Sequence, residues 1–371
     1  FNRVNDEAPG PVLQERKEPR KTHVLTRGIW DKKAEEVQLT IPSSLGNWPD
    51  AKPKTRLELA DWLTSDKNPL TARVTVNNIW QMLFGTGLVK TSEDFGLQGE
   101  QPSHPELLDW LAIYFMENNW DLKKLIKLIV TSQTYRQSSI RNQDTIQKDP
   151  ENRLLSRGPR HRLPSWMLRD GALKISGLLN SEIGGPPIKP YQPEGVWEEM
   201  FMGRFKYEAT DGPAQYKRSL YSFWRRAVAP TFLFDSAQRR VCEVRISRTN
   251  TPLQALTLLN DATFLEASLM LSIKINNASL STDESIKAIM TQLLFRQPNE
   301  IELAILKKEH GKNLAFYENH PSDAEKLISS IKRNIDWNGE LKFKKIDHAK
   351  IAANTLLASM IFNLDEAVTN E

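Results

Sequence analysis

The side chains best suited to binding or chemistry are arginines in the middle of the sequence. Arg160, His161 and Arg162 are consecutive, and Arg245 and Arg248 follow in a segment that also contains apolar residues. A guanidinium carries N–H donors in a fixed fork that matches two acceptor oxygens, so such clusters suit carboxylate, sulfate and phosphate groups. We therefore predict that these arginines contact an anionic ligand. The alternative is that they bridge helix ends and loop carbonyls inside the protein.

The basic charge of the chain is unevenly distributed. The stretch from Arg153 to Arg169 contributes +5, and the stretch from Lys217 to Arg248 contributes +6. Since the whole chain carries a formal charge of +4, the remainder is −7. The acids inside the second stretch are too few for its arginines, so some guanidinium groups must face water, a ligand or an acidic partner. A nucleic-acid partner is not expected, because +4 is a poor track for phosphates.

Aromatic side chains accompany the arginines. Tyr191 and Trp197 lie in an irregular connection at 181–216, and a connection of this length inside a compact domain is usually functional or a boundary. Three further side chains have the i, i+3, i+4 spacing that would place them on one helix face: Tyr221, Trp224 and Arg225. Such groups suit sugars that bear carboxylate or sulfate. The alternative is an aromatic core stripe with a solvated basic edge.

Four titratable side chains are candidates for acid–base chemistry: Glu93, Asp94, His104 and His161. The first three could also bind a divalent cation together with Glu106. The structural alternative is that Glu106 forms a capping box with Ser103 and that His104 belongs to the same first turn. No catalytic residue is assigned from the sequence.

The single cysteine, Cys242, limits the cofactor chemistry. It excludes an internal disulfide, a Cys-x-x-Cys-His haem attachment site and a multi-cysteine zinc site. No metal site and no covalently bound haem are therefore predicted in this chain. Cys242 itself is interpreted as a small buried side chain. No run of about 18 apolar residues occurs, so no membrane span is expected.

The elements that must position these groups are mostly helices. Helical periodicity and capping signals predict an all-α fold: an irregular multi-helix domain with long loops, an extended N-terminal arm and at most minor β structure. The predicted helices begin near Thr55 with a capping box to Glu58, at Pro69, after Ser103, after Asp121, and at 164–179, 217–228, 252–273, 283–295, 299–317, 321–334 and 347–363.

The predicted domain organisation follows from the same pass along the chain. Residues 1–54 are a proline-rich arm or linker from an upstream domain, with one short strand predicted from Val37, Leu39 and Ile41. Residues 55–371 form the helical domain, which the 181–216 connection would divide into sub-lobes at 55–180 and 217–371. The chain begins at Phe1 without a signal-peptide pattern and is interpreted as a fragment or a cleavage product.

Several long motifs occur in order and carry a family resemblance. They are Leu59–Leu63, Asn68–Trp80, Phe84–Val89, Glu93–Gly96, Pro102–Leu111, Thr134–Ser139 and Arg248–Leu256. From about Arg16 onward, and more weakly after about residue 275, the chain resembles the planctomycete-type, cytochrome-c-associated domain of unknown function numbered 1553.

The resemblance implies a setting rather than a mechanism. Such domains usually form the C-terminal part of a larger extracytoplasmic protein, which is periplasmic or secreted and whose upstream part often contains a c-type cytochrome module. The resemblance also implies an association with polysaccharide degradation, and it supplies no catalytic residues to carry over.

Two hypotheses follow. The leading one is that the chain binds or acts on a carbohydrate-type ligand, with electron transfer to a haem in an upstream domain or partner. The rival hypothesis is a non-enzymatic docking or scaffold domain for the upstream domain, a cytochrome or a partner subunit. The predicted ligand contacts are Arg160, His161, Arg162, Tyr191, Trp197, Trp224, Arg225, Arg245 and Arg248.

Overall fold

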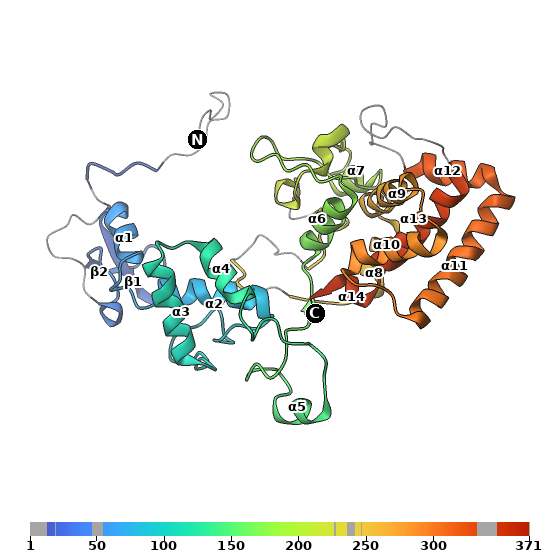
Figure 1. Cartoon of the computed structure of the whole chain (residues 1–371). Coiled ribbons are helices and arrows are strands. Elements are labelled where there is room, and N and C mark those ends of the chain that lie inside the picture. Colours follow the sequence, from blue (N-terminus) through green and yellow to red (C-terminus); the bar gives the residue numbers. More distant parts are fainter. Residues whose placement is uncertain are drawn as a thin grey trace. The chain divides into compact units, whose positions relative to one another are not determined.

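The structure is a computed structural model that divides into two compact units, residues 1–133 and 134–371. This division places 134–180 with 217–371, whereas the predicted sub-lobes separate them. Among the residues that the structure describes, fourteen α-helices and two small antiparallel sheets confirm the mostly helical fold class. Figure 1 shows that helices predominate. The residues that the structure describes are 13–18, 20–46, 55–225, 228–235, 242–245, 247–331 and 347–370.

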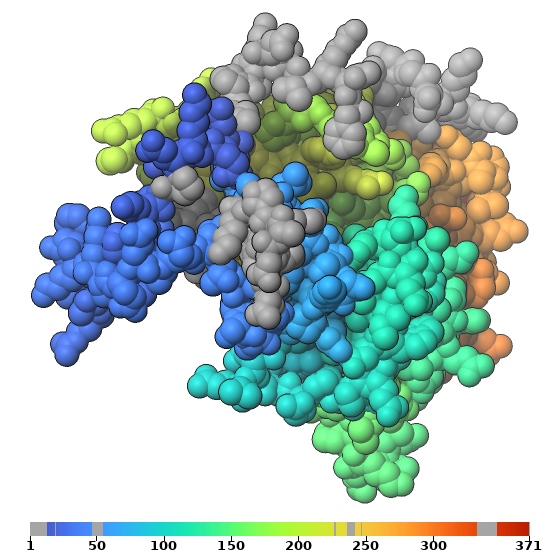
Figure 2. Space-filling model, turned by 90° about the vertical axis from the view of Figure 1, so that its left-hand side faces the viewer, coloured from blue at the N-terminus to red at the C-terminus, as the bar shows by residue number. Residues whose placement is uncertain are grey.

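The first unit begins with a small hairpin. Strand β1 (Thr22–Leu25) pairs antiparallel with β2 (Lys33–Val37), and its residues are almost all exposed. Figure 2 shows this segment, in dark blue, to one side of the helices that follow it. The predicted strand through Val37, Leu39 and Ile41 is therefore wrong in its position. Strand β2 ends at Val37, and the buried side chain of Ile41 packs against Trp62.

Four helices form the rest of the first unit: α1 (Arg56–Leu63), α2 (Thr71–Phe84), α3 (Pro105–Glu117) and α4 (Leu122–Val130). Gly85 ends α2 at a positive φ of 85°, and the Asp121 carboxylate caps α4 as predicted. The capping boxes predicted at Thr55 and Ser103 are wrong, because neither α1 nor α3 has a side-chain cap.

A buried amide joins helix α2 to the loop that follows it. Asn77 is fully buried; its Nδ2 donates to the carbonyl of Val89 (3.1 Å), and its Oδ1 accepts from the Val89 N–H (2.9 Å). One side chain thus satisfies both the N–H and the carbonyl of Val89. This pairing fixes the polar loop against α2 without regular secondary structure.

The second unit is built around two buried helices, α9 (Ala262–Asn277) and α13 (His348–Phe362). Small side chains along their facing surfaces allow close approach, and the Ser272 hydroxyl donates to the Ile351 carbonyl (2.8 Å). The helices around this pair are α6 (Ser165–Ser176), α8 (Pro252–Asn260), α10 (Thr282–Leu294), α11 (Glu300–Asn319), α12 (Pro321–Ile331) and α14 (Asp365–Val368) (Figure 1). Two short helices lie further out: α5 (Gln143–Lys148) and α7 (Val196–Met200).

The helix predicted over 252–273 is two helices. It begins with the predicted Thr251 cap, which forms a capping box with Gln254. The chain then bends by 52° at Asp261, whose carboxylate caps α9. In the part of the chain that the structure describes, no single helix is long and apolar enough to cross a membrane. Only α8 and α9 taken together have that length and composition, and they are bent relative to each other.

The helix predicted over 217–228 is wrong. The described part of this segment instead forms one 3₁₀ turn, η4 (Ser219–Tyr221), and an isolated bridge between Ile188 and Ser222. Another 3₁₀ turn, η3 (Gly212–Tyr216), directly precedes it. Tyr221, Trp224 and Arg225 therefore do not share a helix face.

The physical reason lies in a buried guanidinium on α6. Arg169 is 0% exposed and donates to the carbonyls of Gln215 (2.8 Å) and Lys217 (2.9 Å). These carbonyls are satisfied by a side chain and not by a helical turn. The adjacent Asp170 carboxylate accepts from the N–H (2.8 Å) and hydroxyl (2.7 Å) of Ser219.

We expect Arg169→Met to lower the free energy of unfolding by about 3 kcal/mol, because it leaves buried carbonyls and carboxylates without their cation. The measurement is urea denaturation followed by far-ultraviolet circular dichroism. Arg218→Met, at an exposed position in the same segment, is the control and should change little. Equal stability of the two variants would contradict the role given to Arg169.

Candidate functional site

Four of the predicted contact residues form what we call the arginine–histidine cluster: Arg160, His161, Arg162 and Arg248. His161 and Arg162 form strand β3 (His161–Arg162), which pairs with strand β4 (Thr369–Asn370). The preceding Arg160 makes an ion pair with Asp365 at the start of α14. The cluster is thus held by a part of the chain about two hundred residues further on.

Arg162 is the best-fixed guanidinium of the cluster. Its NH1 donates to the Asn250 side-chain oxygen (2.9 Å), and its Cζ lies over the Phe234 ring, 5.8 Å from the ring centre. Its Nε is buried and has no hydrogen-bond partner in the described structure. Burial lowers the pKa of Arg162, and the carboxylates of Asp235 and Asp365 offset this only in part.

The loop that carries Arg248 and Asn250 is tied down by one carboxylate. Asp235 accepts from the Thr249 N–H (2.7 Å) and the Thr249 hydroxyl (2.8 Å). Gln254, which forms the capping box of α8 with Thr251, donates to the Thr249 hydroxyl (2.7 Å). The hydrogen bonds that Asp235 accepts therefore come from residues that shape the loop, Thr249 and Gln254.

His161 is in an environment that disfavours positive charge. Burial, and secondly the charge of Arg248, lower the pKa of His161 to about 4, so the imidazole is neutral near pH 7. Its Nδ1 is buried without a hydrogen-bond partner among the described residues. Burial likewise lowers the pKa of Arg248.

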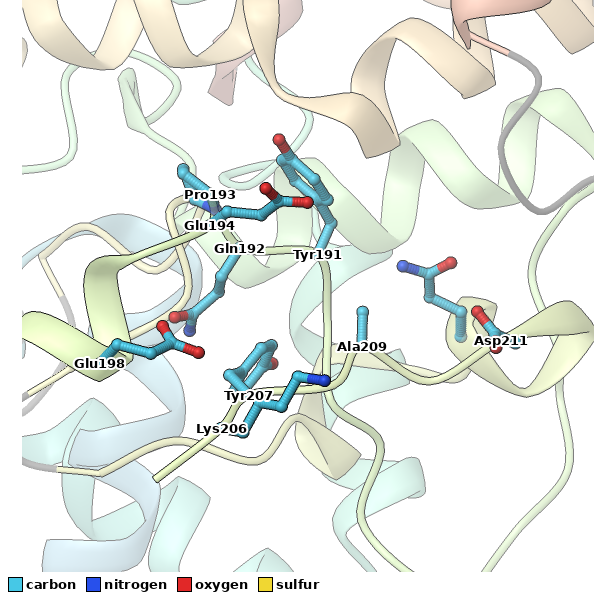
Figure 3. Close-up of a pocket in the computed structure, with 10 residues that line it drawn as sticks. Tyr191, Gln192, Pro193, Glu194, Glu198, Lys206, Tyr207, Ala209 and Asp211 are labelled. Carbon is cyan, nitrogen blue, oxygen red and sulfur yellow. The ribbon is translucent and has the colours of Figure 1, made fainter. Parts of the chain in front are cut away.

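A second site, which we call the α7 pocket, lies in the 181–216 connection. Its volume is about 850 Å³. The residues that line it are Tyr191, Gln192, Pro193, Glu194, Glu198, Lys206, Tyr207, Ala209, Asp211 and Gln215 (Figure 3). Three carboxylates face one ammonium group, so the lining is net acidic.

One wall of the α7 pocket contains a buried amide with a fixed orientation. Gln192 is 7% exposed, and its Oε1 accepts a hydrogen bond from the indole N–H of Trp197. Because the indole can only donate, this contact assigns the amide oxygen and leaves Nε2 as a donor. The Nε2 is buried and has no partner in the described part of the chain.

Trp197 packs against two residues of the pocket lining, Gln192 and Tyr207. It is 3% exposed and stacks on Tyr207, Phe201 and Phe223, with ring centres 5.1–5.9 Å apart. Tyr207 donates its hydroxyl to the Pro190 carbonyl (2.6 Å), and burial raises its pKa. These rings form the core that gives shape to an otherwise irregular connection.

Six of the nine predicted contact residues fall into two groups in the second unit, the arginine–histidine cluster and the α7 pocket. Figure 1 shows α14, beside the cluster, and α7 towards opposite ends of α6. Tyr191 lines the α7 pocket, and Trp197 lies in its core. Arg225 is exposed and covers the Phe205 ring at 4.6 Å, Trp224 beside it is half-buried, and Arg245 is exposed.

The weaker candidates for chemistry lie in the first unit. Asp94 accepts from the Gly96 N–H (2.7 Å) and shapes the loop, and its neighbour Glu93 is exposed. His104 shares a hydrogen bond with the Ser103 hydroxyl (3.0 Å). Within the described ranges, no three His, Cys, Asp or Glu side chains gather to hold a metal ion. Cys242 is exposed, so its interpretation as a buried side chain is wrong.

Other arginines follow the structural alternative. Arg157 is buried and donates to the carbonyls of Asp149 (2.9 Å) and Pro150 (2.9 Å), and Arg169 is held by carbonyls as described above. Sequence reasoning missed the carboxylates, Gln192 and Lys206 of the α7 pocket. The available signal was the concentration of acids in a connection already identified as irregular.

Arg296 fixes helix α14 and strand β4, which hold the arginine–histidine cluster through Asp365 and the pairing with β3. Arg296 donates through two nitrogens to Glu302 (2.7 and 2.8 Å) and through two to Glu366 (both 2.7 Å). Both pairs are bidentate, which fixes the direction of α14 as well as its distance from α11. Asp365 and strand β4 are positioned by this clamp.

Comparison with known proteins gives one match. Residues 55–309 match the family model described as PSD1, a protein of unknown function (DUF1553). No curated protein and no solved structure matches the chain. The matched range contains all of the α7 pocket and the arginines of the cluster, and it stops before α12.

The Arg296 clamp should make stability depend on acidity. Arg296, and secondly the Asn299 N–H, lower the pKa of Glu302 from 4.5 to about 2. A depressed carboxyl pKa stabilises the fold above pH 4.5, and this contribution is lost as the pH falls towards 2. Because the pair is partly exposed, we expect a contribution of about 1 kcal/mol or less.

The measurement is the urea midpoint at about pH 6 and about pH 3. Glu302→Gln should lose less stability between these two conditions than the unaltered protein. Glu309→Gln, on the same helix, is the control and should behave as the unaltered protein does. An identical loss in all three proteins would remove Glu302 from this account.

Proposed function

We propose that this chain, which belongs to the PSD1 family of unknown function (DUF1553), binds a carbohydrate in the α7 pocket. The observation that carries the proposal is the Gln192 amide, a buried donor without a partner in the wall of a cavity of about 850 Å³. A buried polar group without a partner costs free energy, and a ligand acceptor would remove that cost.

The remaining lining suits sugar hydroxyl groups. Glu194 and Glu198 supply acceptors for hydroxyl protons, and Lys206 supplies a donor. Tyr191 and Tyr207 present ring surfaces for the C–H faces of a pyranose (Figure 3). A concave site with a few convergent polar groups and aromatic walls is the usual form of a small-molecule site.

The charge of the pocket selects among sugars. Glu194, Glu198 and Asp211 against Lys206 give a formal net charge of −2 in the lining. A uronate or a sulfated sugar would add a further negative charge to a lining that is already net negative, which costs free energy. The proposed ligand is therefore a neutral or amine-bearing sugar, and the anionic ligand expected from the sequence is not assigned to this pocket.

We further propose that the chain functions outside the cytoplasm beside a c-type cytochrome module. The support is the motif resemblance described for the sequence, since a single Cys242 cannot form a haem attachment site in this chain. The haem of that module would supply an electron acceptor. The role of this chain would be to bind and orient the sugar.

A docking function is the second candidate. Leu253 and Leu256 are one turn apart on α8 and are 73% and 55% exposed, directly after the loop of the arginine–histidine cluster. Exposed leucines next to arginines suit a partner surface with an apolar centre and an acidic rim. The partner would be the upstream domain or the cytochrome.

The carbohydrate proposal is tested by isothermal titration calorimetry with cellohexaose, xylohexaose, mannohexaose and a glucosamine hexamer, and with polygalacturonate as the anionic comparison. We expect binding of at least one neutral or amine-bearing hexamer. Tyr191→Ala and Glu198→Gln should each weaken it at least about fivefold, the equivalent of one lost contact of about 1 kcal/mol.

Glu309→Gln, which lies on α11 outside the pocket, is the matched control and should bind normally. The proposal fails if no hexamer binds, or if the pocket variants bind as well as the control while remaining folded. Preference for polygalacturonate would show that the charge argument is wrong.

A further inference from the structure

We infer that another cavity of the second unit is a further carbohydrate subsite, so that one chain holds a polysaccharide at two places. This cavity, which we call the α13 pocket, has a volume of about 640 Å³ and shares no lining residue with the α7 pocket. The choice of a carbohydrate as ligand rests on the proposed function of the α7 pocket. The α13 pocket nevertheless has binding features of its own.

The α13 pocket lies where the ends of four helices meet. Its lining comes from the C-terminal ends of α9 and α11 and from the first residues of α12 and α13. Figure 1 shows these four helices together in one part of the second unit. Helix ends present polar groups that the helices themselves do not use. The pocket is therefore polar although the helices around it form an apolar core.

Most charged side chains of the lining have partners inside the protein. The Asp347 carboxylate caps α13 by accepting from the Lys350 N–H (3.0 Å), and the Lys350 ammonium donates to the Leu280 carbonyl (2.8 Å). The Nδ1 of His348 lies 3.4 Å from a carboxylate oxygen of Glu325. An anionic ligand would compete with Asp347 for the N-terminus of α13, so an anion is not favoured in this pocket.

The neutral polar side chains of the lining, by contrast, are unused. Asn276, Asn277 and Ser279 line the pocket, and none of their side chains forms a hydrogen bond with another described residue. An amide offers donors and an acceptor at once, and so does a hydroxyl. Sugar hydroxyl groups also donate and accept, so the two sets are complementary. The exposed Glu318 carboxylate adds an acceptor for hydroxyl protons.

Tyr317 supplies the observation that points to a ligand. It lines the pocket although it is only 8% exposed, because its ring packs in a cluster with Ala324 and Ala352. Its hydroxyl forms no hydrogen bond within the described part of the chain. The carboxylate of Asp323, which acts on Tyr317, is paired with Lys326 (3.0 Å). A nearly buried hydroxyl without a partner costs free energy, and a ligand acceptor would remove that cost.

The Tyr317 hydroxyl is a fixed donor at neutral pH. Burial, and secondly the charge of Asp323, raises the pKa of Tyr317, so the hydroxyl keeps its proton. The packed ring holds the hydroxyl in place, and a donor held before the ligand arrives loses little conformational entropy on binding. A hydroxyl or ring oxygen of a sugar could accept this hydrogen bond. The amides of the same lining could then bind its other hydroxyl groups.

The same polymer suits both pockets. In the α13 pocket, Glu318 and Asp347 against Lys350 give a formal charge of −1 with histidine counted as neutral, and the α7 pocket carries −2. A uronate is therefore disfavoured in both, and a neutral or amine-bearing sugar fits both. A polymer that reaches two sites on one chain gains affinity, because its second contact is intramolecular.

The test is isothermal titration calorimetry of the full chain with cellohexaose, xylohexaose, mannohexaose and the glucosamine hexamer. We expect two sites for at least one of these hexamers. Tyr317→Phe keeps the ring and removes only the hydroxyl, and it should weaken one site at least about fivefold, as should Asn276→Ala. Tyr114→Phe, on α3 in the first unit, is the matched control and should bind as the unaltered protein does.

A second readout uses the unaltered protein and does not depend on the folding of a variant. His348 lines the α13 pocket, so a saturating hexamer should shift the nuclear magnetic resonance signals of its imidazole. His104 precedes α3 in the first unit, and its signals should stay in place.

The variants also separate this inference from the proposed function. Loss of one site in Glu198→Gln and of the other in Tyr317→Phe supports both, and so does a single site weakened by both, since one hexamer would then occupy the two pockets. Binding that responds to Tyr317→Phe and not to Glu198→Gln supports the α13 pocket alone. The inference is overturned if no hexamer binds, if His348 stays unshifted at saturation, or if both Tyr317→Phe and Asn276→Ala bind as Tyr114→Phe does.

Discussion

The fold of the second unit depends on burying one guanidinium, that of Arg169. A fully buried cation is costly unless hydrogen bonds and opposite charges compensate it. Two backbone carbonyls of the 215–217 segment accept from its NH1 and NH2, whereas its Nε has no hydrogen-bond partner among the described residues. The carboxylates of Asp170, Asp261 and Glu266 offset the lowering of its pKa by burial. The Phe232 ring covers the guanidinium at 5.0 Å. This arrangement attaches an irregular segment to helix α6 through side-chain hydrogen bonds.

Both candidate sites follow from that constraint. Gln215, whose carbonyl accepts from Arg169, also lines the α7 pocket, so the floor of the pocket is attached to the core through one side chain. Helix α6 begins at Ser165, directly after the strand that carries His161 and Arg162. The arginine–histidine cluster and the α7 pocket are therefore supported by the same helix. The arginines in this part of the sequence serve two purposes, since some build the scaffold and others remain available at its surface.

The amphipathic helices could be predicted from the sequence, because their apolar spacing already identifies the buried face. The caps at Asp121 and Thr251 could equally be predicted, since their hydrogen bonds join residues two or three positions apart. The prediction failed over 217–228, where the carbonyls are taken by Arg169, a residue about fifty positions away. Local spacing contains no information about such a contact. The same limit explains why Thr55 and Ser103 fit the capping pattern without forming the hydrogen bonds.

The candidate sites were predictable to a similar degree. Adjacent arginines identified the cluster, because the residue type alone suggests its chemistry. The sequence did not show which guanidinium would be satisfied internally, and Arg157 and Arg162 differ in this only through their distant neighbours. The Gln192 donor was unpredictable for the same reason. Its free amide nitrogen exists because Trp197 occupies the amide oxygen.

The pairing of β3 with β4 has a consequence for the biosynthesis of the protein. Arg160 and Asp365 are 205 positions apart. At typical translation rates of about 5–20 residues per second, the ribosome needs on the order of 10–40 seconds to add the intervening chain. The donors of β3 remain uncovered throughout that interval. A polypeptide whose synthesis stops before β4 would lack this pairing, so the cluster forms only after the second unit has been synthesised through β4.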